Sequence, residues 1–462
     1  MILAAFIAYG AALAFIGILG YARTRDYADF VLGGRRLGPW VAAVSAGASD
    51  MSGWLLLALP GLAATAPGEA FWVAAGLGLG TYLNWRLVAR RLRIATFEAD
   101  DAVTLPEFLA RRYPASGGTL RRLSALVIVV FFTLYAAAGL VAGAKLFVSV
   151  FDIDYAQGLL VGAAVILAYT YGGGFFAVAL TDLVQGVLML LALSVVPALA
   201  LRDIGATSLG GGAPVSLLDA GGPLGIASAL AWGLGYFGQP HILARFMALG
   251  DPAAAGRARW IATAWTGFGL AAALAVGVIG ADPVFGPLVG GDPERIFLEM
   301  IALILPPAIA GICLAGVLAA VMSTADSQLL VAASAIATDL FGAGKGALVR
   351  GRLGVVAVLG AAVIIAADPD SRVLDFVAWA WAGFGATFGP LILLTLYRPK
   401  LSERAALTTL CTGLFVVVGW RWLPGRAREI YELLPAFVAA LAAGLLVDAA
   451  FRSSNRPNGR NE

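Results

Sequence analysis

Apolar runs of about 20 residues recur along the chain, separated by short segments rich in arginine, glycine and proline. A helix of about this length crosses the ~30 Å hydrocarbon core of a bilayer. The pattern therefore predicts an all-α integral membrane protein. We expect thirteen transmembrane helices, at 2–21, 39–60, 68–88, 123–149, 156–171, 177–201, 225–248, 259–280, 307–339, 353–367, 373–397, 405–422 and 430–450.

Two of these predicted helices contain a break. Residues 45–60 read SAGASDMSGWLLLALP, and an aspartate such as Asp50 inside a spanning helix usually faces a cavity or a partner within the bundle. Residues 232–241 read WGLGYFGQPH, in which glycine and proline both weaken a helix. Two interrupted segments at matching positions of two halves indicate a transporter site near the bilayer midplane. The alternative for 45–60 is a close helix contact in which Asp50 pairs with a neighbour.

A third polar patch, AAVMSTADS at 319–327, lies inside an apolar run. Ser323 and Ser327 are four residues apart, and Thr324 and Ser327 are three apart, so their hydroxyls can line one face of a helix. Hydroxyls and unwound carbonyls are oxygen ligands that suit a hard cation such as sodium. The alternative is that each hydroxyl bonds a carbonyl of the preceding turn, although Asp326 in the same patch favours a site.

The composition agrees with a membrane protein and disfavours several other classes of function. The chain is 60% hydrophobic and 13% charged, with a mean hydropathy of +0.88. A net charge of +3 is too small to indicate a nucleic-acid partner. Cys313 and Cys411 both lie in apolar runs and suggest neither a disulfide framework nor a metal cluster. No cofactor or obligate protein partner is evident, and the single histidine, His241, has no recognisable nucleophile or metal partner, which disfavours an enzyme.

Basic residues predict the orientation of the chain. If the N-terminus is outside, most of the 31 Lys and Arg residues fall on inner segments. We therefore expect a multi-pass membrane protein with its N-terminus outside and its C-terminus in the cytoplasm. Its parts would be a leading helix and inner loop (1–38), spans two to six (39–201), spans seven to eleven (202–397), and two trailing helices with a short tail (398–462).

Several runs together resemble the proline branch of the sodium:solute symporter family. They are ASDMSGWLL at 48–56, LVARRLR at 87–93, TLPEF at 104–108, AWGLGYFGQPHILARFM at 231–247, AAVMST at 319–324 and WAWAGFGA at 379–386. The resemblance covers nearly the whole chain. It implies a LeuT-like core of five plus five helices in inverted repeat, and sodium-coupled import of L-proline by alternating access across a bacterial-type plasma (inner) membrane.

The resemblance also implies site residues. The sodium ligands would be the backbone carbonyls of Ala48, Met51 and Ala320 and the hydroxyls of Ser323 and Thr324, supported by Asp50. The residues around proline would be Ser52, Gly53, Tyr135, Trp232, Tyr236 and Pro240. The residues themselves also suit such a site, apart from the resemblance. A half-helix that begins after Ser52 would carry a partial positive charge at its N-terminus, which suits the carboxylate of proline. Taken alone, the aromatic residues would more often be packing residues.

One position departs from this pattern. At Asp326 the proline branch has a small or hydroxyl residue. Asp182, Asp326 and Ser327 could hold a second cation or share a proton, since neighbouring carboxylates raise each other's pKa; alternatively, Asp326 pairs with a basic residue or meets water in an inner vestibule. Three other functions also stay open: a symporter of another small solute driven by sodium or protons, a substrate-sensing relative, and a channel, although no repeated selectivity-filter loop is present.

Overall fold

The computed structural model describes residues 2–23, 31–170, 175–204, 220–285, 291–342, 344 and 346–454. In this part of the chain the regular elements are helices, and one isolated bridge joins Leu37 to Leu249. Helix occupies most of each of the thirteen ranges predicted to span the membrane. The end of the predicted tail, 455–462, lies outside the described residues.

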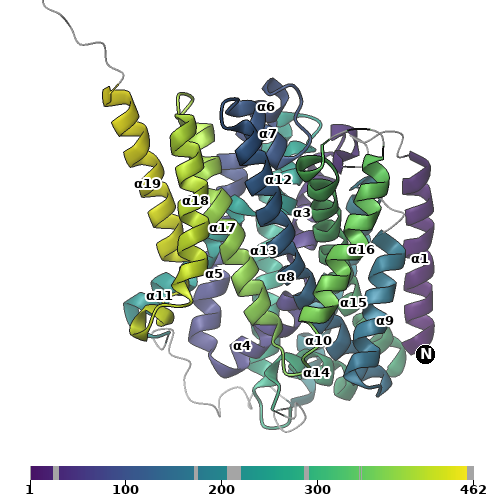
Figure 1. The fold of residues 1–462 in the computed structure, drawn as a ribbon. Coiled ribbons are helices and arrows are strands. Elements are labelled where there is room, and N and C mark those ends of the chain that lie inside the picture. The colour runs from purple at the N-terminus through teal and green to yellow at the C-terminus, as the bar shows by residue number, and fades with distance from the viewer. Residues whose placement is uncertain are drawn as a thin grey trace, which may run out of the picture.

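The helices pack side by side in one bundle (Figure 1). The long continuous ones are α1 (Ile2–Arg23), α5 (Pro67–Asn84), α8 (Gly117–Phe151), α9 (Tyr155–Thr170), α10 (Phe175–Ile204), α13 (Ala255–Gly280), α15 (Pro307–Ser334), α16 (Ala347–Ile365), α17 (Val373–Tyr397), α18 (Glu403–Trp420) and α19 (Leu433–Ser454). Shorter helices are α6 (Arg90–Glu98), α7 (Leu105–Arg112) and α14 (Ile296–Ile304).

The bundle is that of a multi-pass membrane protein. Six described helices are long and apolar enough to cross a bilayer, and a bent pair adds a seventh span. The six are Gly117–Phe151, Val178–Arg202, Pro252–Gly280, Pro307–Leu340, Val373–Tyr397 and Leu433–Ser453. The helices differ in how much of their apolar length is buried inside the bundle. The buried share of the most apolar stretch is 83% in the spans that contain α15 and α17, but only 33% in α19, so α15 and α17 are central and α19 is peripheral. The helices α1 and α19 lie at opposite edges of the bundle (Figure 1).

The first predicted break is present. Helix α3 (Pro39–Asp50) ends at Asp50, and the chain continues as a π-helical turn (Trp54–Ala58) and α4 (Leu59–Thr65) with a bend of 62°. Met51 has non-helical backbone angles, φ −78° and ψ 77°. The indole Nε1 of Trp54 donates to the carbonyl oxygen of Asp50 at 2.7 Å. A side chain thus satisfies one of the carbonyls at the helix end, as unwound backbone at membrane depth requires.

The second predicted break is also present. Helix α11 (Gly222–Leu230) continues as a 3-10 segment (Ala231–Gly238), and α12 (Pro240–Met247) follows an extended residue. Glycine permits very close packing here. A Cβ atom on Gly235 would lie 1.9 Å from Nε1 of Trp381, and one on Gly238 would lie 2.2 Å from a backbone oxygen of α17. The broken segment is therefore pressed directly against α17.

Candidate functional site

The two breaks meet at one hydrogen bond. The hydroxyl of Tyr236, from the second break, donates to Oδ2 of Asp50, from the first, at 2.6 Å. Both side chains are buried, and Oδ1 of Asp50 has no hydrogen-bond partner among the described residues. No ion pair in the described part of the chain includes Asp50. The described hydrogen-bond partner of the Asp50 carboxylate is therefore a hydroxyl from the other broken helix.

Oxygen atoms from α3 and α15 lie close together at Ala48, two residues before Asp50. Oγ of Ser323 lies 2.9 Å from the carbonyl oxygen of Ala48 and 3.1 Å from that of Ala320. Oγ1 of Thr324, the next residue, is buried without a hydrogen-bond partner. Met51 is fully buried at the end of α3. The structure thus brings Ala48, Ala320 and Ser323 into contact and leaves the oxygen of Thr324 available beside them.

The aromatic residues predicted to surround a substrate belong to a larger cluster. The ring of Trp232 stacks on Tyr431 with centroids 4.8 Å apart and planes at 18°. The ring of Tyr236 stands edge-on to Trp381 at 4.9 Å. Trp381 also donates to the backbone oxygen of Trp232 at 2.7 Å. Sequence reasoning did not name Trp381 or Tyr431 as site residues, although Trp381 lies in the WAWAGFGA run at 379–386.

The remaining substrate candidates are more dispersed. Oγ of Ser52 accepts a hydrogen bond from the backbone N–H of Trp54 at 3.3 Å. Gly53 packs so closely that a Cβ atom would lie 2.5 Å from Cβ of Ala142. The hydroxyl of Tyr135 is buried without a hydrogen-bond partner among the described residues. Pro240 begins α12 and lines a cavity of about 20 Å³ between α7, α12 and the end of α15.

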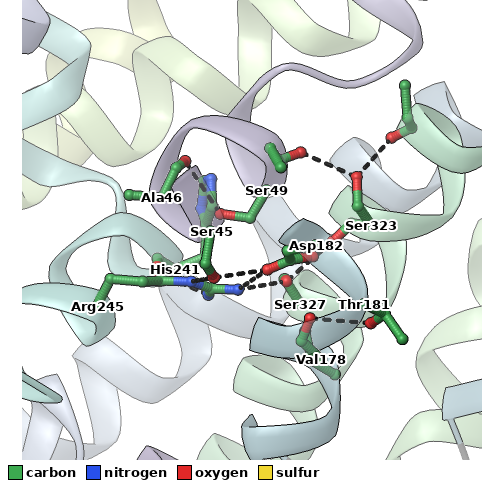
Figure 2. Close-up of polar contacts among 12 residues, drawn as sticks. Ser45, Ala46, Ser49, Val178, Thr181, Asp182, His241, Arg245, Ser323 and Ser327 are labelled. Atoms are coloured by element: carbon green, nitrogen blue, oxygen red, sulfur yellow. Dashed lines mark hydrogen bonds and ion pairs between the residues drawn. The ribbon is translucent and has the colours of Figure 1, made fainter. Parts of the chain in front are cut away.

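The predicted second cluster contains an arginine that sequence reasoning missed. Figure 2 shows the side chain of Arg245 directed towards both Asp182 and Ser327. Its Nη2 donates to Oδ2 of Asp182 at 3.0 Å and to Oγ of Ser327 at 2.7 Å. Asp326 is fully buried, and neither of its carboxylate oxygens has a hydrogen-bond partner among the described residues. One sequence feature could have identified Arg245 as a site residue: it is a charged residue inside the predicted span 225–248.

The bundle has the fold of solved membrane symporters. A Na⁺-coupled sialic acid symporter in a substrate-bound, outward-open state superposes with a TM-score of 0.75 at 17% identity, covering 97% of this chain and 98% of that one. A nucleobase-cation-symport-1 family transporter gives a TM-score of 0.57 at 14% identity, covering 93% and 96%. At these identities the likeness concerns the fold.

Sequence comparison identifies the family. The Sodium:solute symporter family profile matches residues 30–413, and the chain belongs to this family. The osmoregulated proline transporter OpuE of Bacillus subtilis (strain 168) is 42% identical, with 95% of this chain and 92% of that protein covered. The sodium/proline symporter of Escherichia coli (strain K12) is also 42% identical, with 94% and 90% covered.

Proposed function

We propose that this protein imports L-proline across a bacterial inner membrane, coupled to sodium entry, by alternating access. The observation that carries the proposal is the oxygen cluster of Ser323, Ala48 and Ala320 beside the Asp50–Tyr236 hydrogen bond. The relatives named as sodium/proline symporters support the substrate and the ion. The proposal requires sodium, proline and a lipid bilayer, and it needs no cofactor or obligate protein partner.

The sodium site would use oxygens from both α3 and α15. Because the hydroxyl of Ser323 already lies within hydrogen-bond distance of two carbonyls, a small cation needs only modest shifts to be surrounded by these atoms. The unpartnered hydroxyl of Thr324 and the carbonyl of Met51 would complete the shell. The carboxylate of Asp50, on the same end of α3, would support the cation electrostatically.

Proline would bind at the two breaks. Its carboxylate suits the N–H groups that start the π-helical turn after Ser52 and Gly53, where a half-helix carries partial positive charge. Its ring would lie against Trp232, Tyr236 and Tyr135, with Pro240 on the cytoplasmic side. These aromatic side chains offer a large apolar contact area without flexible charged groups.

The membrane topology forms part of the proposal. We infer thirteen spans, with five-helix repeats at 39–201 and 202–397 that each begin with a broken helix, and with 1–38 and 398–462 outside this core. The position of the breaks in α3–α4 and in α11–α12 supports the repeats. The start of α1 and the end of α19 lie at opposite ends of the bundle, and arginine-rich α6 and α7 lie at the same end as the end of α19 (Figure 1). This arrangement supports an outside N-terminus and a cytoplasmic C-terminus.

A second cation or a shared proton at Asp182, Asp326 and Ser327 stays a prediction. The structure already places one positive charge, that of Arg245, against Asp182.

Uptake by the purified protein in liposomes tests the proposed function. An inward sodium gradient should drive accumulation of labelled L-proline, and an inside-negative potential should add about 2.3 kcal/mol per charge per 100 mV. Choline in place of sodium, at the same ionic strength, is the control. Sodium-dependent binding of proline without accumulation would instead indicate a sensor. Sodium-driven uptake of another solute, with no competition by proline, would contradict the substrate assignment.

A further inference from the structure

Segment 421–432, which joins α18 to α19, carries a tyrosine that contacts the second break. The ring of this residue, Tyr431, stacks on that of Trp232, with centroids 4.8 Å apart and planes at 18°. The segment lies beside α11, at the end of the bundle where α1 begins (Figure 1). In the proposed topology this end faces the outside. Tyr431 therefore covers one face of the Trp232 indole with a ring that comes from outside the ten-helix core.

Hydrogen bonds fix Tyr431 to two helices of the core. Its hydroxyl donates to the backbone oxygen of Ala378 on α17 at 2.7 Å. Its backbone N–H donates to Oγ of Ser228 on α11 at 2.6 Å. The side chain is thus held at its far end and the backbone at the other. Because both ends are held, the plane of the ring is restricted.

The chain on both sides of Tyr431 is held as well. Trp420, the last residue of α18, donates through Nε1 to the backbone oxygen of Ala427 at 2.8 Å. Leu433, the first residue of α19, is fully buried. A Cβ atom on Gly385 would lie 2.8 Å from Cδ1 of Leu433, so the start of α19 is pressed against α17. These contacts keep the tyrosine at the second break.

Trp232 is the residue on which the proposed proline site most depends for ring contact. It is buried, and its backbone oxygen accepts a hydrogen bond from Nε1 of Trp381 at 2.7 Å. That bond fixes the backbone of Trp232 but leaves the rotation of its indole to the neighbours of the ring. A binding side chain gives a defined contact when its rotamer is locked by packing. The stacked ring of Tyr431 supplies this packing.

We propose that Tyr431 is a positioning residue of the substrate site. It holds the Trp232 indole in the orientation that contacts the proline ring, and it leaves the other face and the edge of the indole for the substrate. The two trailing helices, α18 and α19, thereby contribute to substrate affinity although they lie outside the ten-helix core. This inference rests on the proposed function.

The test separates proline affinity from transport capacity. Initial rates of labelled proline uptake in liposomes, at saturating sodium, give the half-saturating proline concentration and the maximal rate per folded transporter. Tyr431→Leu fills the space with an apolar side chain that cannot stack. Its half-saturating proline concentration should rise about 3- to 10-fold, with a maximal rate within about twofold of wild type. Tyr431→Phe keeps the stacked ring and should restore the concentration to within about twofold of wild type.

A double variant tests whether Tyr431 acts through Trp232. In a Trp232→Ala background, Tyr431→Leu should raise the half-saturating proline concentration by less than about twofold more, because no indole is left to position. Effects of the two substitutions that multiply overturn the inference. An unchanged half-saturating concentration in folded Tyr431→Leu protein overturns it too. A lower maximal rate at an unchanged half-saturating concentration would show a structural role alone, and likewise overturns it.

Tyr155→Leu is the matched control for losing a tyrosine. Tyr155 is also partly buried, begins α9 outside both broken helices, and donates to the backbone oxygen of Ala366 at 2.9 Å. This variant should keep the wild-type half-saturating proline concentration. If Tyr431→Leu does not fold, Tyr431→Met, whose flexible side chain adapts to the available space, takes its place and should show the same rise. Absence of any sodium-dependent proline uptake in the wild type overturns the proposed function instead, so the two failures are distinct.

Discussion

Tyr236→Phe removes the hydrogen bond between the two breaks and keeps the aromatic ring. The hydroxyl is the only described partner of the Asp50 carboxylate, because Oδ1 of Asp50 has none. A hydrogen bond to a charged group contributes about 1.5–3 kcal/mol, and leaving the buried carboxylate unpaired forfeits that amount. Asp50 ends the helix that carries Ala48, so the loss falls on the geometry of the proposed sodium site. We expect the half-saturating sodium concentration to rise about 10- to 100-fold.

The measurement is initial proline uptake in liposomes as a function of sodium concentration. At saturating sodium the proline affinity should change by less than about threefold, since the ring against Trp381 remains. Tyr155→Phe is the control, because Tyr155 begins α9, outside both broken helices, and donates to the carbonyl of Ala366 at 2.9 Å. It should lose about 1 kcal/mol of stability and keep normal sodium activation. Sodium activation within about threefold of wild type in folded Tyr236→Phe protein would refute the reasoning.

Four further variants test other parts of the site by the same uptake assay. Asp50→Asn removes the charge and keeps an oxygen acceptor, so sodium activation should weaken by about tenfold or more, and unchanged activation would contradict its role. Ser323→Ala and Thr324→Ala each remove one proposed ligand and should each raise the half-saturating sodium concentration; an equal loss of proline binding with and without saturating sodium would place these hydroxyls in the substrate site. Trp232→Ala should raise the half-saturating proline concentration roughly 10-fold or more through lost ring contact, without altering sodium affinity at saturating proline, and normal proline affinity in well-expressed protein would argue against the pocket.

The local features of the fold could be predicted from the sequence because each depends on residues that are adjacent in the chain. Apolar runs indicated where helices lie, and the composition of 45–60 and 232–241 indicated where two of them break. Both breaks are present in the structure. Helical spacing also placed the hydroxyls of Ser323 and Ser327 on one side of α15, four residues apart.

Contacts between helices were not predictable in the same way. Asp50 and Tyr236 are 186 residues apart, and their hydrogen bond depends on the depth and rotation of two helices in the bundle. The same limit explains why Arg245 was missed, since its partners come from α3, α10 and α15. Spacing placed Asp326 and Ser327 side by side, yet Ser327 bonds Arg245 while the Asp326 carboxylate has no described hydrogen-bond partner. A difference of one residue turns a helical side chain by about 100°, and only packing shows what it then meets.

The pattern of contacts also suggests how sodium and substrate could influence each other. Among the described residues, two side-chain hydrogen bonds join the broken helices: Tyr236 to Asp50, and Arg245 to Ser45. These contacts tie the first break to the second and so favour their movement together. The proposed sodium ligands are divided differently, because Ala48 belongs to a broken helix whereas Ser323 belongs to α15. A cation bound by both Ala48 and Ser323 would stabilise the conformation in which the two broken helices lie against α15. The distance between the aromatic residues and the first break depends on that conformation. Sodium would thereby favour the substrate site through its shape, without contacting proline.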